Sequence, residues 1–191
     1  GIDLTDFFSY YVFDTITHHF AIESCSFSEN YAKVKITSRT ESNSNSPCAN
    51  IRIPITFMDS TFNRYDSMII DNGTREEHNF SLPFTPIAAF LDFDEEFFDL
   101  TTDSYKFISE PGNYEFKNSY FKANVNSCQD SILIRPTLHW VGENQEQLPE
   151  GVNRFSQKHY WTIEGVNLDK ADIDAKFYFK ISFSERDFDN S

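Results

Sequence analysis

The residues with the clearest potential for chemistry are the carboxylates between positions 92 and 99. In an extended segment, Asp92, Asp94 and Glu96 would share one face, because successive side chains of a strand alternate between its two faces. Oxygen ligands of this kind suit calcium, so the three residues form a candidate calcium site. The run lacks the glycine and the ligand spacing of an EF-hand loop, and a solvated charged turn is the alternative interpretation.

The histidines form no recognisable catalytic or zinc-binding pattern. His18 and His19 are adjacent in a predicted strand, so their side chains point to opposite faces, and the other three have no partner at ligand spacing. Neither H-E-x-x-H nor G-x-S-x-G occurs in the sequence, and the 6 glycines form no phosphate-binding loop. We assign no catalytic residue, no metal ligand other than the calcium candidates and no cofactor, and we expect that this chain by itself is not an enzyme.

Three large aromatic residues are candidates for ligand binding. Trp140, Tyr160 and Trp161 lie near predicted loops, where rings can stack on sugars or anchor a protein partner. The alternative is a place in the core. For Trp140 this alternative is favoured, because the residue follows closely on an apolar alternation that includes Ile134 and Leu138.

The composition is that of a folded, acidic protein. Apolar residues make up 39% of the 191 positions and aromatic residues 17%, which is enough to build a core. The net charge of −14 disfavours nucleic acid and anionic membranes as partners. No apolar run approaches the roughly 20 residues that span a bilayer, so membrane insertion is not expected. Acidity also keeps a secreted protein soluble, and cations, basic proteins and neutral glycans remain as partners.

Alternation of apolar and polar residues predicts strands through most of the chain. The strand candidates cover residues 19–27, 31–40, 51–57, 77–84, 113–126, 131–141, 158–165 and 174–183. Pro54 has no N–H to donate, so a sheet edge or a bulge is expected there. Polar stretches at 41–47 and 142–151 predict exposed loops.

The order of these elements predicts an all-β fold of two consecutive sandwich modules of the Ig-like type. Residues 3–14 are the one helical candidate, with Asp3 as its cap and apolar residues at helix-face spacing. We expect residues 1–104 to form this helix and the first module, and residues 105–191 to form the second. Ser191 follows closely on the last predicted strand, as it would in a truncated second module.

The three cysteines give no metal-binding pattern. Cys25 and Cys48 flank a predicted hairpin and could pair in an oxidising compartment. Buried thiols are the alternative for both residues and for Cys128, because free cysteine packs as a small hydrophobic residue. An odd number of cysteines without C-x-x-C spacing does not support a zinc site.

Two parts of the chain resemble a known family. The N-terminal residues GIDLTDFFSYYVF, followed by HFAIES at 19–24, are similar to the segment that leads from the catalytic domain into a β-sandwich in aminopeptidase N-like zinc metallopeptidases. Segments 53–57 and 80–84 also fit that sandwich. The match departs from the family where Tyr10 and Tyr11 stand in place of a common Trp, and where a Gly-x-Pro turn is missing between 14 and 18.

The second half of the chain resembles an extra module that follows the sandwich in secreted bacterial members of this family. The similarity lies in four short segments, at residues 105–108, 131–135, 139–141 and 160–165. The family motifs H-E-x-x-H and G-x-M-E-N are absent, so no catalytic residue carries over.

The resemblance implies a non-catalytic, C-terminal region of a secreted, periplasmic or cell-surface bacterial metallopeptidase. Its partner would be the catalytic domain of the same polypeptide, and zinc is expected only in that domain. Gly1 stands where an initiating Met would be expected, in keeping with an excised fragment. The alternative function is that of a glycan- or protein-binding β-sandwich adhesion module.

Overall fold

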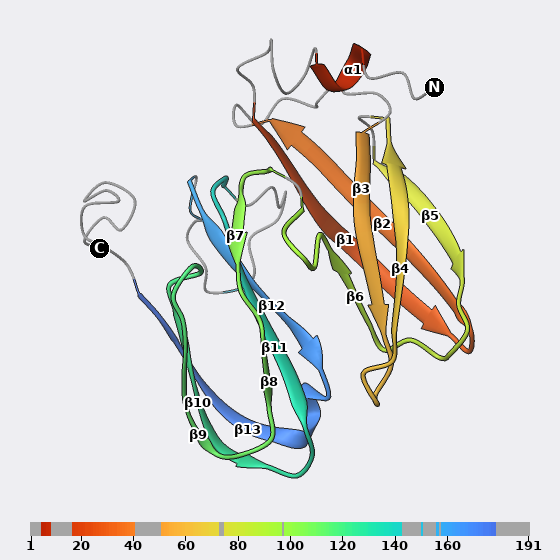
Figure 1. Cartoon of the computed structure of the whole chain (residues 1–191). Coiled ribbons are helices and arrows are strands. Elements are labelled where there is room, and N and C mark those ends of the chain that lie inside the picture. Colours follow the sequence, from red (N-terminus) through yellow and green to blue (C-terminus); the bar gives the residue numbers. More distant parts are fainter. Residues whose placement is uncertain are drawn as a thin grey trace. The chain divides into compact units, whose positions relative to one another are not determined.

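The computed structural model describes residues 5–8, 17–40, 51–72, 75–96, 98–142, 150, 156 and 158–178. Within these residues the protein is all-β, with strands paired in antiparallel sheets (Figure 1), which confirms the predicted class. The chain divides into two compact units, residues 1–100 and 101–191, called unit 1 and unit 2 below. The sequence placed the module boundary near 104; unit 2 begins at Thr101 because the strand Thr101–Asp103 pairs inside it.

Several sequence predictions fall partly or wholly outside the described residues. Of the expected helix at 3–14, the structure describes one turn, α1 (Thr5–Phe8). The loop at 41–47, Cys48, most of the loop at 142–151 and the strand predicted beyond residue 178 lie outside. No helix in the described part of the chain has the length and apolar character that crossing a bilayer requires.

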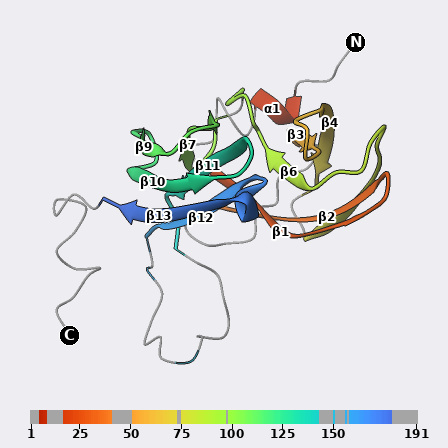
Figure 2. The ribbon, with the colours of Figure 1, turned by 90° about the horizontal axis from the view of Figure 1, so that it is seen from below.

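Unit 1 contains two three-stranded sheets that share one hydrophobic core. The first has the order β1 (His18–Ser28), β2 (Tyr31–Thr40), β5 (Glu76–Ser81), and the second has the order β4 (Arg64–Asp71), β3 (Ile51–Met58), β6 (Ala88–Leu91). Figure 2 shows β1 and β2 as one layer and β3 and β4 as another. Alternation directs the inward side chains of both layers into one buried cluster, which includes Val34, Ile36, Ile53, Ile55 and Phe57. The arrangement is that of a β-sandwich.

Pro54 lies in the middle strand of its sheet, and the early end of the pairing with β6 explains how a residue without an N–H is accommodated there. β4 pairs with the whole of β3, but the pairing with β6 ends at Ile55 opposite Leu91. Pro54 therefore has a strand on one side only, and its carbonyl accepts a hydrogen bond from the Asp92 N–H at 2.9 Å on the other side. Its position is locally that of an edge, as the missing donor predicts.

Unit 2 also contains two sheets around a core of its own. One has the order β13 (Ala171–Phe177), β10 (Phe121–Cys128), β9 (Gly112–Phe116). The other has the order β12 (Tyr160–Val166), β11 (Ile132–His139), β7 (Thr101–Asp103), with β8 (Lys106–Ile108) also paired to β11, and the short 3₁₀ turn Leu168–Lys170 connects β12 to β13. The buried cluster contains Ile108, Phe116, Phe121, Ala123, Val125, Ile132 and Ile134.

The single strand predicted over residues 113–126 is wrong, because the segment forms a hairpin. β9 and β10 are joined by a turn over 117–120, in which the Tyr120 N–H donates to the Lys117 carbonyl at 3.3 Å. Tyr120 adopts a left-handed φ of 51°. Phe116 and Phe121 face each other across the turn, with ring centroids 5.6 Å apart. The aromatic pair and the ladder stabilise a turn that lacks glycine and proline.

Candidate functional site

The candidate site is a hollow of about 180 Å³ on the face of β3 and β4 that points away from the core of unit 1. Ile55 and Phe57 point inward, so Pro54 and Thr56 point outward. Strand register places Pro54 opposite Met68 and Thr56 opposite Asp66. Residues 92–96, which follow β6, form the remaining wall. The hollow is therefore built by one hairpin and the loop that covers it.

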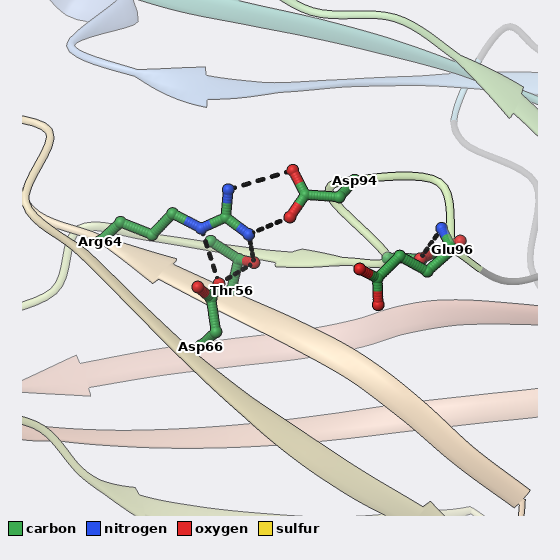
Figure 3. A network of polar contacts seen from close by, with 6 residues as sticks. Thr56, Arg64, Asp66, Asp94 and Glu96 are labelled. Carbon is green, nitrogen blue, oxygen red and sulfur yellow. Dashed lines mark hydrogen bonds and ion pairs between the residues drawn. The ribbon is translucent and has the colours of Figure 1, made fainter.

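Arg64, on β4, is the centre of a polar network that connects the hairpin to the loop at 92–96 (Figure 3). Its Nε donates to Asp66 Oδ1 at 2.7 Å, its Nη1 donates to Asp94 Oδ1 at 3.1 Å, and its Nη2 donates to Asp94 Oδ2. Thr56 Oγ1 donates to Asp66 Oδ1 at 2.7 Å, and the guanidinium carbon lies 5.2 Å from the centre of the Phe93 ring. The hydrogen bonds to Asp94 and then to Asp66 raise the pKa of Arg64 above its usual value. We call this arrangement the Arg64 clamp; it fastens the loop to the hairpin through a bidentate, charge-assisted pair.

The loop that carries Asp94 is held by its own backbone contacts as well. Asp92 and Glu95 adopt left-handed φ values of 44° and 53°, and Asp92 Oδ1 accepts the Glu96 N–H at 2.8 Å. The short side chain of Asp92 tolerates this conformation because it can bond to nearby backbone groups, as it does here to the Glu96 N–H. Figure 3 shows the Glu96 side chain extending from the loop toward the side on which Arg64, Thr56 and Asp66 lie.

The predicted calcium residues are brought near one another, but two of the three have other contacts. Asp94 binds Arg64, and Asp92 accepts from the Glu96 backbone. Among the described residues, no group of three or more His, Cys, Asp or Glu side chains is arranged to hold a metal ion. Calcium binding stays a prediction. The sequence reasoning missed Arg64, which lies 30 residues before Asp94 and meets it only through the fold.

The candidate aromatic residues do not form one platform. Tyr160 and Trp161 are neighbours on β12 and point to opposite faces of the sheet. Trp140 Nε1 donates to Thr102 Oγ1 at 3.1 Å, and Trp161 Nε1 donates to the Ser119 carbonyl at 2.8 Å. All three rings are half-buried, which fits an interior role at least as well as ligand binding. Glycan binding stays a prediction.

The histidines and cysteines have contacts typical of structural residues. His19 is buried and lies 3.3 Å from Arg39 Nε, measured to its Nδ1, while the His18 ring stacks against Phe20 at 6.2 Å between centroids. Cys25 is exposed on β1, so the prediction of a buried thiol is wrong for this residue, and Cys128 is half-buried on β10. The proposed pairing of Cys25 cannot be followed in the structure, since Cys48 lies outside the described residues.

A buried charged group lies in unit 2, and no pattern in the sequence predicted it. Arg135 on β11 donates through Nη2 to Asp103 on β7, and the side chain of each is 4% exposed. Glu164 on β12 is the cross-strand partner of Arg135, with its Oε2 3.9 Å from Arg135 Nη1. Burial raises the pKa of Glu164 to about 7, with Arg135 opposing the shift and Asp103 adding to it. Three charges from three strands therefore share one face of the sheet.

The stability of unit 2 is expected to fall as the pH rises from about 5 to about 8. The folded state binds a proton on Glu164 with a pKa of about 7, whereas the unfolded chain releases it near 4.5. Between these values the folded state holds more protons, so its advantage is complete below the lower pKa and lost above the higher one. The full shift would correspond to about 3 kcal/mol. Since the Glu164 side chain is 32% exposed and solvent screens its charge, we expect the unfolding free energy of unit 2 to fall by about 1–2 kcal/mol over this range.

Urea unfolding followed by tryptophan fluorescence measures this effect, because Trp140 and Trp161, the chain's 2 tryptophans, both lie in unit 2. Glu164→Gln should flatten the pH dependence of the unfolding free energy. Glu110→Gln, which neutralises an exposed carboxylate of the same unit, should leave it intact. Equal slopes in the wild type and in Glu164→Gln would contradict the assignment.

Comparison of the chain with family models, with curated proteins and with solved structures finds no match. The resemblance to aminopeptidase N-like metallopeptidases thus depends on the short sequence segments alone. Function has to be inferred from the residues and their geometry.

Proposed function

We propose that the chain is a non-catalytic accessory region, made of two Ig-like β-sandwich modules, of a secreted, periplasmic or cell-surface bacterial protein of the aminopeptidase N-like class. The observation that supports this proposal is that several arginine and tryptophan side chains, which could bind ligands, make structural contacts within their own unit. Arg64 fastens a loop to a hairpin, Arg135 joins three strands, and the indole N–H groups of both tryptophans bond within unit 2. These groups hold shape.

Two units that each have a core support the proposed accessory role. Separate clusters of buried aliphatic and aromatic residues make each unit a stiff body, as a spacer or a wall beside a catalytic domain requires. The sequence resemblance would place this region after the catalytic domain, which would then be its partner and would carry the zinc. An adhesion module that binds a protein is the second candidate, and the hollow beside Arg64 favours it.

Three observations test the accessory role. The purified chain should hold far less than one zinc per chain by elemental analysis, and it should hydrolyse no aminoacyl reporter above the buffer rate. The coding sequence upstream of Gly1 should contain an H-E-x-x-H motif, because that motif supplies two zinc ligands and the general base on one helix face. One tightly held zinc per chain, reporter hydrolysis, or an upstream sequence without the motif would each contradict the proposal.

A further inference from the structure

We propose that the hollow beside the Arg64 clamp binds a lysine side chain of a protein partner. The lining combines carboxylates, of which Glu96 and Asp66 are central here, with the apolar surfaces of Pro54 and Met68. This inference does not depend on the accessory role, since a module of any parent protein could use the site.

The size of the hollow selects a single side chain. Its volume is about 180 Å³. An engineered cavity of about 150 Å³ takes up one benzene molecule, and pockets for drug-sized ligands measure about 300–1,000 Å³. The hollow therefore suits one long side chain and is too small for a cofactor.

The charge of the lining selects a cation. Four acidic residues (Asp66, Asp92, Asp94 and Glu96) and one basic residue (Arg64) line the hollow, which gives 1 − 4 = −3. The Arg64 N–H groups already donate to the carboxylates of Asp66 and Asp94, which neutralise its charge, so Arg64 would not attract an anion to the hollow. In contrast, the Glu96 carboxylate and Asp66 Oδ2 have no partner among the described residues and can accept hydrogen bonds from an ammonium group.

The apolar surface favours lysine over a small cation and over arginine. Met68 is 46% exposed beside Pro54, and Ile70, 47% exposed, continues the same face of β4. A lysine packs its four-carbon stem on such a surface while its ammonium group reaches the carboxylates. Arginine gains most from a bidentate carboxylate, and the clamp already uses Asp94 in that way.

β4 provides room for the chain that would carry this lysine. It stands at the end of the sheet order β4-β3-β6, so in the part of the chain that the structure describes one side of the strand has no partner in that sheet. The net charge of −14 would also attract a basic protein from a distance. A partner segment with one lysine beside apolar residues matches the hollow and the exposed Met68 and Ile70 together.

A titration of the full ¹⁵N-labelled chain with short peptides tests the proposal by NMR. The probe is acetyl-Ala-Lys-Ala-amide, and its matched partner carries norleucine, which keeps the four-carbon stem and lacks the charge. The lysine peptide should shift the amide signals of Thr56, Met68 and Glu96 and the Nε–H signal of Arg64, and norleucine should bind several-fold more weakly. Glu96→Gln should lower the affinity about two- to fivefold, as removal of one exposed charge pair does.

Glu110→Gln is the control, because it makes the same change in net charge on unit 2. It should leave the affinity unchanged, and the spectra of both variants without peptide should match that of the folded wild type. Equal binding of the norleucine peptide, equal losses in the two variants, or the absence of shifts around the hollow would overturn the proposal. So would calcium if, added alone at micromolar concentration, it shifted the same signals, because the site would then be one for a metal ion.

Discussion

Replacement of Arg135 by methionine is expected to lower the free energy of unfolding of unit 2 by about 3–5 kcal/mol, the usual result of removing one partner of a buried ion pair. The side chain of Asp103 is 4% exposed, and Arg135 binds its Oδ2. Without the guanidinium this carboxylate would stay buried without a counter-charge, or would have to take up a proton. Urea unfolding followed by tryptophan fluorescence reports the loss, since both tryptophans lie in unit 2.

A double variant separates the unpaired charge from lost packing. Arg135→Met with Asp103→Leu removes both charges of the pair and keeps apolar volume at both positions. At about pH 6 Glu164, with its pKa of about 7, stays mostly protonated, so most of the lost stability should return. If the double variant is as unstable as the single one, the ion pair is not the cause, and the aliphatic stem of Arg135 is. A loss below about 1 kcal/mol in the single variant would mean that water reaches the pair as it reaches surface pairs.

The fold was largely predictable because burial on one face of a sheet leaves a period of two in the sequence. Residues 31–40 and 51–57 alternate clearly, and both form strands whose inward residues enter the core of unit 1. The hairpin at 113–126 was not predictable in this way. Its turn residues include no glycine or proline, and Tyr120 adopts a left-handed conformation, which its residue type does not predict. Only the three polar residues 117–119 interrupt the alternation, which resumes at Phe121.

The sites were less predictable because their residues meet across strands. The acidic residues at 92–96 stood out as a cluster, but the Arg64 that binds Asp94 comes from a strand 30 residues earlier. Arg135 and Asp103 lie 32 residues apart and meet because β7 and β11 are neighbours in one sheet. Both contacts depend on how the strands pair and in which register, and a single sequence predicts strand pairing and register only poorly.

Gly165→Ala is expected to destabilise unit 2 by about 3 kcal/mol or more, at the upper end of what an extra methyl group costs in a packed site. Gly165 lies on β12 opposite Ile134. A β-carbon at this position would stand 2.0 Å from the Leu133 carbonyl oxygen and 2.8 Å from Leu168 Cδ2. The Leu168 side chain can turn away, but the Leu133 carbonyl is part of the backbone of β11, the central strand of its sheet. Relief therefore requires β11 and β12 to separate locally and to lose ladder hydrogen bonds.

Gly112→Ala is the matched control, because Gly112 also lies in a strand of unit 2. A β-carbon there would meet only the Tyr114 ring, at 3.5 Å, which is an ordinary contact. The control should leave stability unchanged or raise it by up to about 1 kcal/mol, since alanine restricts the unfolded chain. Urea midpoints from tryptophan fluorescence compare the two variants directly. Equal midpoints would show that β11 and β12 are not in the register that brings Gly165 against the Leu133 carbonyl, and the placement of Glu164 beside Arg135 would then be wrong as well.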